Sequence, residues 1–190
     1  KIQSSRRMNQ AGGKDTPELD EKVAKYAKEE GKNFVGRDGA AEATARMGYL
    51  PPEKAVEKSG SMGIAIPGGV FHLIDSEGQE IAEPYITGEL VYEGKNVTLG
   101  YAECGEDLAK GDERHGRLET GDMAQFDEDG YYYIVGRKKR FLKIFGNRVN
   151  LDEIDRLIKG EYQIEVASSG VDDHMYLFVT EEKYADPIRN

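Results

Sequence analysis

The stretch from Leu118 to Asp155, LETGDMAQFDEDGYYYIVGRKKRFLKIFGNRVNLDEID, indicates the fold more strongly than any other part of this chain. It places Asp122 and Arg137 at the two ends of a predicted β-hairpin that turns at Asp129-Gly130. A carboxylate accepts hydrogen bonds from both hydroxyls of a ribose, and a guanidinium suits phosphate or ribose oxygens. The pattern predicts a ribose and phosphate site. A turn acid and a surface salt bridge between the two residues are the alternatives.

A series of cations follows this hairpin. Lys138, Lys139 and Arg140 form a basic group that is either solvated charge or a joint able to move a cation toward an anion. Lys143 and Gly146 come next, in a predicted strand pair. Gly146 is expected at positive φ or where a ligand chain passes close, and a plain hairpin turn explains it equally well.

The flanking sequence predicts both helices and strands. A helix that Asp15 or Thr16 caps runs to Gly31, with Leu19, Val23, Tyr26 and Ala27 on one face. A short strand at 33–35, a loop at 36–41 and a helical turn at 42–47 follow. Short apolar runs alternate with turn signals from Ser59 to Val135, which indicates an antiparallel sheet or a small barrel. Asn150 then caps a helix that ends at Gly160, before strands at 164–168 and 175–180.

The bulk composition narrows the classes of function. The chain has 36 acidic and 26 basic residues, a formal net charge of −10, which argues against a nucleic-acid or anionic-membrane binder. No apolar run is as long as a membrane span. Cys104 is the only cysteine, and the histidines lack ligand spacing. A soluble cytoplasmic protein is the simplest expectation.

Two glycine segments are weaker candidates for sites. Gly39-Ala40-Ala41 is a tight loop whose N–H groups can face a phosphate, and Glu42 can bind Mg²⁺ through one oxygen. A plain helix entry is the alternative. Gly12-Gly13 is a flexible pair before the first helix.

Taken in order, these segments resemble the later part of the adenylate-forming enzymes: acyl-CoA synthetases, aryl-CoA ligases and peptide-synthetase adenylation domains. The similarity runs from Gly12 to Thr180. The matching elements are Lys58 to Gly63 with Pro67-Gly68, Gly88-Glu89-Leu90, Gly100-Tyr101, Thr120-Gly121-Asp122, Gly136-Arg137, Lys143 to Arg148, and Glu153-Ile154-Asp155. Each is a weak signal alone, and their common order and spacing make the resemblance specific.

The resemblance implies roles for individual residues. Asp122 would bind the ribose hydroxyls of ATP, and Arg137 would contact the same nucleotide. Lys139 would be the hinge about which a small C-terminal lobe swings, with Lys143 and Gly146 near the adenylate or the incoming thiol. The remaining implied residues are Gly39, Ala40 and Ala41 at the nucleotide, Glu42 at Mg²⁺, and Gly12 and Gly13 near the acyl pocket.

The same resemblance implies an α+β fold in three parts. Residues 1–58 would be the end of an N-terminal α/β region, 59–137 an antiparallel β-barrel-like subdomain, and 138–190 the hinge and a partial C-terminal lobe. The reaction would join a carboxylic acid to AMP from ATP, with Mg²⁺, and pass the acyl group to a thiol such as CoA or a phosphopantetheine carrier.

Three departures from the family pattern bear on activity. The Ser/Thr/Gly-rich phosphate loop and the C-terminal Gly-Lys motif are absent from the sequence. Asp38 replaces an aromatic residue that would stack on adenine, and Ala41 replaces a threonine. We therefore expect this chain to be weakly active or inactive by itself. The alternative is a non-catalytic interaction or scaffold module derived from the ligase fold.

Overall fold

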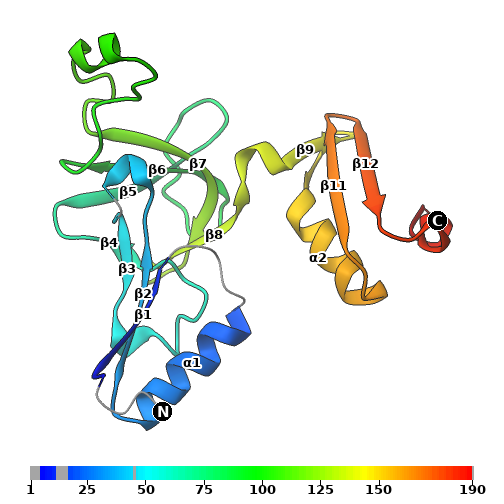
Figure 1. The fold of residues 1–190 in the computed structure, drawn as a ribbon, viewed down its shortest axis with the longest axis horizontal. Helices are drawn as coiled ribbons and strands as arrows, with labels where there is room; N and C mark the ends of the chain where they lie inside the picture. The colour runs from blue at the N-terminus through cyan, green and yellow to red at the C-terminus, as the bar shows by residue number, and fades with distance from the viewer. Residues whose placement is uncertain (1–4, 12–16, 45, 190) are drawn as a thin grey trace. The chain divides into compact units, whose positions relative to one another are not determined.

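The computed structural model describes residues 5–11, 17–44 and 46–189, and Figure 1 traces them from blue to red. They form an α+β structure in two compact units, Lys1–Val135 and Gly136–Asn190. Among the described residues, no helix is long and apolar enough to span a membrane.

The first sheet of the N-terminal unit has the order β1-β2-β3-β4. Its strands are β1 (Arg7–Ala11), β2 (Asn33–Asp38), β3 (Gly48–Leu50) and β4 (Ile64–Ala65). β1 is parallel to β2, and α1 (Pro17–Glu29) makes the crossover between them. No strand was predicted at β1. Its sequence, RMNQA, is mostly polar, and it holds an edge position where alternate side chains face solvent.

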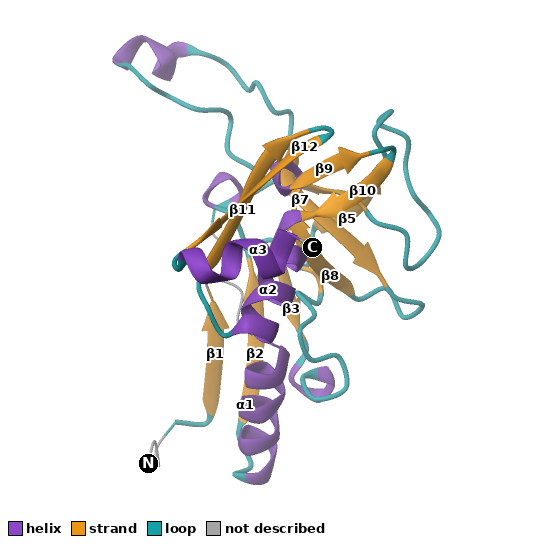
Figure 2. Ribbon diagram, turned by 90° about the vertical axis from the view of Figure 1, so that its right-hand side faces the viewer, coloured by secondary structure: helices purple, strands orange, loops and turns teal. Residues whose placement is uncertain are grey.

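Helix α1 lies along this sheet (Figure 2). It packs there through small residues. Ala24 and Ala27 are 2% and 1% exposed and contact the cluster around Phe34, whereas Leu19 and Tyr26 are 47% and 42% exposed. The predicted apolar face was therefore wrong at Leu19 and Tyr26, because the alanines let the helix approach the sheet closely. The predicted caps Asp15 and Thr16 lie outside the described residues.

Strand β2 is longer than predicted. Pairing with β3 aligns Gly36 with Leu50 and Asp38 with Gly48, so the expected loop at 36–38 is strand instead. The later strand β3 supplies the hydrogen-bond partners of these residues. The local strand propensity of residues 36–38 does not predict such a pairing. The helical turn predicted at 42–47 is only the 3₁₀ turn η1 (Ala41–Ala43).

The second sheet has the order β5-β6-β7-β8. It consists of β5 (Gly69–Ile74), β6 (Gly88–Gly94), β7 (Arg117–Phe126) and β8 (Tyr132–Arg137). β6 pairs antiparallel with both β5 and β7, as predicted. Its described strands form an open row with no β5–β8 pairing, so closure into a barrel is not confirmed.

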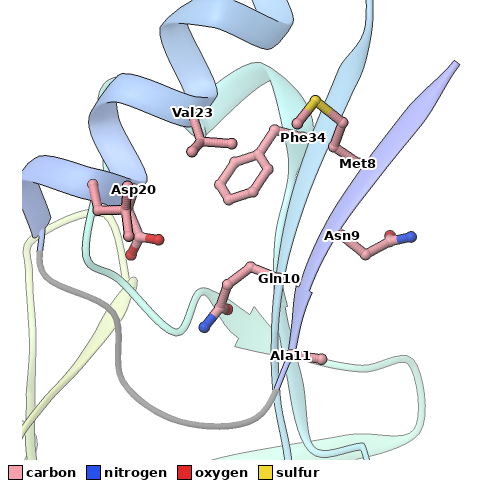
Figure 3. Close-up of a pocket in the computed structure, with 8 residues that line it drawn as sticks. Met8, Asn9, Gln10, Ala11, Asp20, Val23 and Phe34 are labelled. Atoms are coloured by element: carbon pink, nitrogen blue, oxygen red, sulfur yellow. The ribbon is translucent and has the colours of Figure 1, made fainter. Parts of the chain in front are cut away.

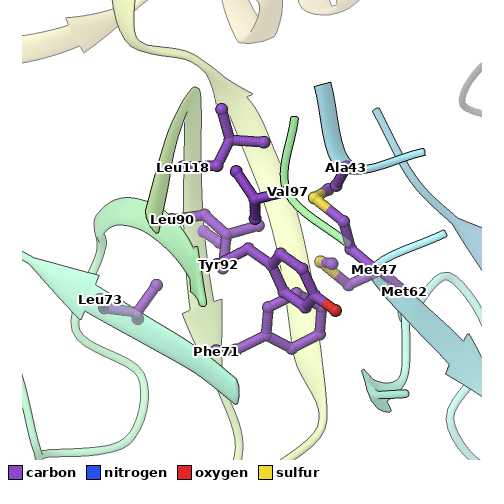
Figure 4. Close-up of a cluster of buried hydrophobic side chains, with 10 residues drawn as sticks. Ala43, Met47, Met62, Phe71, Leu73, Leu90, Tyr92, Val97 and Leu118 are labelled. Carbon is purple, nitrogen blue, oxygen red and sulfur yellow. The ribbon is translucent and has the colours of Figure 1, made fainter. Parts of the chain in front are cut away.

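The main core lies against this second sheet (Figure 4). Leu90 and Tyr92 of β6 are fully buried, and Phe71 of β5 packs near Tyr92 with the ring centroids 5.6 Å apart. Met47 and Met62 join the same cluster from the connections of the first sheet. The main core therefore also takes in residues from the connections of the first sheet, and a second cluster around Phe34 lies under α1. Short 3₁₀ turns, η2 (Pro52–Lys54) and η3 (Gly105–Ala109), lie in its loops.

The C-terminal unit is built from two hairpins and a helix. The hairpins are β9 (Phe141–Ile144) with β10 (Asn147–Asn150) and β11 (Val166–Val171) with β12 (His174–Val179). Between them lies α2 (Leu151–Tyr162), whose first turn the Asn150 side chain caps through the Asp152 amide, as predicted. The remaining elements are η4 (Lys138–Arg140), η5 (Glu182–Tyr184) and α3 (Ala185–Arg189).

The end of α2 differs from the prediction. The helix continues through Gly160 and ends at Gln163, which adopts the left-handed conformation with φ 56°. The Gln163 amide donates to the Lys159 carbonyl, and its side chain donates to the Gly160 carbonyl. These C-terminal bonds offset the cost of an exposed glycine within a helix, about 1 kcal/mol.

A nearly buried ion-pair cluster fixes the turn between β7 and β8. The Lys58 ammonium lies 2.9 Å from Asp127 and 2.5 Å from Asp129, and the Lys58 and Asp127 side chains are 12% and 9% exposed. Asp127 also accepts bonds from the Tyr131 amide and the Tyr133 hydroxyl. Burial raises the pKa of Tyr133 to about 12, so its hydroxyl remains a donor at neutral pH. This cluster ties the motif at Lys58 to the hairpin.

We predict that Asp127→Asn destabilises the N-terminal unit by about 1–3 kcal/mol, because the buried donors lose a charged acceptor. Urea unfolding followed by circular dichroism measures the change. Asp129→Asn is the matched control: it removes a carboxylate from the same ammonium, but the Asp129 side chain is 61% exposed, so little effect is expected. Equal losses of stability in the two variants would contradict the structural role assigned to Asp127.

The same cluster predicts a pH dependence. Burial opposes ionisation of Asp127, but bonds from Lys58, Tyr131 and Tyr133 outweigh it and lower the carboxyl pKa. A lowered folded-state pKa stabilises the protein above the unfolded value of about 3.9, and this stabilisation is lost as the pH falls through the lowered pKa. The stability difference between wild type and Asp127→Asn should therefore shrink in acid. A stability difference between the two proteins that stays constant from neutral pH to pH 2 would contradict the lowered pKa of Asp127.

Candidate functional site

Asp122 lies in a local bulge of β7. The pairing with β6 aligns Met123 with Glu89 and Glu119 with Val91, so Thr120, Gly121 and Asp122 together lie opposite Leu90. Gly121 takes φ 71°, a conformation that glycine adopts without strain. Such a bulge redirects the side chains next to it and is frequent beside active sites.

Hydrogen bonds hold the bulge in place. The Thr120 hydroxyl donates to the Leu90 carbonyl over 2.9 Å, and the Asp122 amide donates to the same hydroxyl over 3.1 Å. Asp122 itself is half-buried. The Thr-Gly-Asp sequence is therefore more than a turn: threonine bonds across the sheet, glycine supplies the backbone angle, and aspartate is held at a defined position.

The segment that carries Glu42 is held from the connection between β6 and β7. The Asn96 amide donates to the carbonyls of Ala43 and Arg46 over 2.7 and 2.8 Å, and its own side-chain oxygen accepts from the Tyr92 hydroxyl. Thr44, at φ 50°, donates its hydroxyl to the Asn96 carbonyl. One asparagine thus holds the end of the η1 turn and the residues that follow it.

Glu42 has two further bonds to the same connection. The Thr98 amide donates to its backbone carbonyl over 2.8 Å, and the Tyr101 hydroxyl donates to its Oε1 over 2.5 Å. The Arg114 guanidinium lies 4.5 Å from the centre of the Tyr101 ring and donates to the Thr98 hydroxyl. The hydrogen bond to Glu42 raises the pKa of Tyr101, so its hydroxyl stays protonated. Tyr101 was not predicted as a site residue, and its only signal was the Gly100-Tyr101 motif.

The loop before Glu42 is short and leads into the 3₁₀ turn η1. Ala40 is extended, and the amides of Ala43 and Thr44 bond back to the carbonyls of Ala40 and Ala41 over 3.0 and 3.1 Å. Asp38 is the last residue of β2, and its carbonyl accepts from the Met47 amide. The binding roles predicted for Gly39, Ala40 and Ala41 stay predictions.

Arg137 and Lys139 fall at the start of the C-terminal unit. Arg137 ends β8, and Lys138, Lys139 and Arg140 form η4. Arg137 and Lys139 are exposed. Asp122 belongs to the other unit, so the predicted closeness of Asp122 and Arg137 stays a prediction.

Arg140 has a structural role within its unit. Its guanidinium donates to Asp152 over 2.7 Å, to Asp155 over 2.5 Å and to the Ser168 carbonyl over 2.6 Å. The other oxygen of Asp155 is buried and has no hydrogen-bond partner among the described atoms. Arg140 therefore joins η4, α2 and β11. Its paired guanidinium differs from the freely solvated charge that was one of the two interpretations of this basic group, and the interpretation as a movable joint stays a prediction.

The tip of the β9–β10 hairpin is braced from the β11–β12 turn. Asp173 accepts from the Phe145 amide over 2.7 Å, Asp172 accepts from the Lys143 amide over 2.8 Å, and the Asp173 amide donates to the Lys143 carbonyl. Phe145 and Gly146 take φ 48° and 81°, which confirms the positive φ predicted for Gly146. The Lys143 side chain is exposed.

A pocket of about 340 Å³ lies between β1 and α1 (Figure 3). Met8, Val23 and Phe34 give it an apolar wall, and Gln10 and Asp20 add polar groups. Ala11 at its edge precedes Gly12 and Gly13, which lie outside the described residues. The described part of the chain has no group of three side chains suited to hold a metal ion, so Glu42 would need a ligand's oxygens to complete a site.

Comparison with known proteins identifies the class. The chain is homologous to part of the AMP-forming CoA ligases, which confirms the resemblance inferred from its motifs. It is 33% identical over 139 residues to 2-succinylbenzoate–CoA ligase of Geobacillus sp. (strain WCH70), covering 73% of this chain and 28% of that protein. It is 36% identical over 148 residues to 4-hydroxybutyrate–CoA ligase 1 of Metallosphaera sedula, covering 74% and 26%. No family model matches the chain.

Solved structures agree on the fold. O-succinylbenzoate coenzyme A synthetase of Bacillus subtilis, unliganded, superimposes with a TM-score of 0.71 at 22% identity over 96% of this chain and 39% of that one. The same enzyme in complex with ATP and magnesium ion gives 0.68 at 24% identity, over 95% and 39%. The chain thus spans about a quarter of the length of these curated relatives and about two fifths of these solved chains.

We predict that Arg140→Lys lowers the free energy of unfolding of the C-terminal unit by about 1–3 kcal/mol. A lysine ammonium lacks the planar guanidinium fork that bonds two carboxylates and a carbonyl at once. Hydrogen exchange of the α2 and β11 amides, compared with β6, measures this. Arg156→Lys is the control on the same helix, where a 77% exposed arginine lies 3.9 Å from Glu153. Unchanged exchange in α2 would contradict the role of Arg140.

Proposed function

We propose that this chain carries the ribose side of the ATP site of an AMP-forming acid–thiol ligase. The observation that supports it most is the Thr120-Gly121-Asp122 bulge, which holds a half-buried carboxylate in a chain homologous to CoA ligases. In this proposal Asp122 accepts hydrogen bonds from the two ribose hydroxyls. Arg137 contacts the same nucleotide, with its planar fork directed at ribose or phosphate oxygens.

The remaining residues complete the proposed site. Gly39, Ala40 and Ala41 lie along the nucleotide, and Gly12 and Gly13 near the acyl group. Lys139 is the hinge position, and Lys143 and Gly146 meet the adenylate or the thiol when the C-terminal lobe moves. We further propose the three-part organisation 1–58, 59–137 and 138–190, with a barrel-like second part, in a cytoplasmic protein.

Glu42 is the proposed contact to Mg²⁺. Magnesium on a nucleotide needs only one or two carboxylates in addition to phosphate oxygens and water, and a carboxylate held by Tyr101 suits that arrangement. When bound, the ion neutralises phosphate charge that develops as pyrophosphate leaves. CoA or a phosphopantetheine carrier is the proposed thiol that accepts the acyl group.

The proposed chemistry has two steps. A carboxylate oxygen attacks the α-phosphorus of ATP, an O–P bond forms, the bond to the β-phosphate oxygen breaks, and pyrophosphate leaves. A thiolate then attacks the acyl carbon, a C–S bond forms, the bond from the acyl carbon to the phosphate oxygen breaks, and AMP leaves. Asp122 and Arg137 contribute by fixing the nucleotide, since positioning can supply a large part of such a rate enhancement. The chain has counterparts to only part of its relatives, so we expect little turnover from it alone.

A second candidate is a non-catalytic interaction module built from the same fold. Asp38 and Ala41 favour it. In the family pattern an aromatic residue and a threonine occupy these positions, and a half-buried carboxylate beside a triphosphate is electrostatically unfavourable. The two candidates differ in whether the chain binds ATP.

Isothermal titration of Mg·ATP, and of a non-hydrolysable acyl-adenylate mimic, tests the proposal. We expect saturable binding that Asp122→Ala weakens at least tenfold, because the ribose loses a charged acceptor. Asp129→Ala, which removes an acid from the turn after the same strand, is the control and should bind as wild type does. Absence of binding at millimolar ligand would favour the interaction module. Carboxylate-dependent exchange of labelled pyrophosphate into ATP would refute the expectation of little turnover.

A further inference from the structure

The Tyr101 hydroxyl donates a hydrogen bond to the Glu42 carboxylate. The two residues are 59 apart in sequence, and the phenol reaches Oε1 over 2.5 Å. A charge-assisted bond of this kind is shorter and stronger than one between neutral groups. It therefore restricts the direction in which the Glu42 carboxylate points.

The position of Tyr101 is itself fixed. Its ring is 67% exposed, so core packing does not hold it. Instead the Arg114 guanidinium stacks on the ring at 4.5 Å and donates to the Thr98 hydroxyl, while the Thr98 amide donates to the Glu42 backbone. Tyr101, Thr98 and Arg114 thus form a connected support on one side of Glu42.

We infer that Tyr101 is a positioning residue that orients Glu42 toward the magnesium ion of a bound nucleotide. The inference rests on the proposed function, since it assigns Tyr101 to the same site. A phenol donating to one oxygen leaves a carboxylate further lone pairs for other ligands, and the partners that orient metal ligands in this way are a general feature of metal sites. In this inference Tyr101 acts through Glu42 and is assigned no contact of its own with the nucleotide.

A purely structural role for Tyr101 predicts something different. If the phenol only attached the connection between β6 and β7 to the η1 turn, its loss would lower stability and would weaken nucleotide binding equally with and without magnesium. Asn96 and Thr98 attach the same segments through separate bonds. Removing one hydroxyl should therefore leave the backbone of η1 in place and change chiefly the orientation of the carboxylate.

The test is the magnesium dependence of ATP binding, measured by titrating Mg²⁺ at fixed ATP and protein by calorimetry. For Tyr101→Phe we expect the half-saturating Mg²⁺ concentration to rise about tenfold, the lower end of the effect of losing an outer partner of a metal ligand. Binding of ATP in EDTA and the melting temperature should change little. Tyr85→Phe, which removes the hydroxyl of another exposed tyrosine in the N-terminal unit, is the matched control.

A double-variant cycle separates action through Glu42 from other effects. Glu42→Gln should itself raise the magnesium requirement, and adding Tyr101→Phe to it should change nothing further, because the phenol acts through the carboxylate. Additive effects, an unchanged magnesium requirement in Tyr101→Phe, or equal weakening with and without Mg²⁺ would each overturn the inference while leaving the proposed function intact. Absence of Mg·ATP binding by the wild type would overturn both.

Discussion

The burial of β6 on both faces is the constraint on which the N-terminal unit depends. Leu90, Val91 and Tyr92 are each 0% exposed, and burying an apolar side chain of this size contributes about 1.5–3 kcal/mol. The same strand provides the polar attachment points of the candidate site. The Leu90 carbonyl accepts from Thr120 in the bulge that carries Asp122, and the Tyr92 hydroxyl bonds Asn96, which holds the turn that carries Glu42. Packing of one strand therefore positions two separate parts of the candidate site.

The connection from β6 to β7 is ordered by polar bonds in addition to the packing of its Val97 in the main core. Asn96, Thr98 and Tyr101 each bond the segment around Glu42, from positions more than fifty residues later in the sequence. Such bonds cost conformational entropy, which the nearby buried strand reduces because it fixes the start of the connection. In the C-terminal unit a single side chain connects the elements. The Arg140 guanidinium joins α2 and β11 through charge-assisted hydrogen bonds.

The structure gives a physical reason for several of the sequence motifs that this chain shares with AMP-forming ligases. The elements that match the family pattern include the places where the backbone has special geometry, such as the bulge at Gly121 and the hairpin tip at Gly146. Asp38 departs from the pattern at the end of a strand whose pairing with β3 is regular. The change at Asp38 thus alters the chemistry beside the proposed nucleotide and leaves the strand intact.

The sequence by itself determined the local features and the family. Asn150 as a helix cap, positive φ at Gly130 and Gly146, and the antiparallel texture of the second sheet follow from interactions between near neighbours, and the order of the motifs indicated the ligase class. Only the tertiary structure decided the polar strand β1, the full length of β2, and the partners of Glu42 and Arg140. These depend on groups that are not neighbours in the sequence and whose approach is set by packing. No local propensity or spacing encodes such partners.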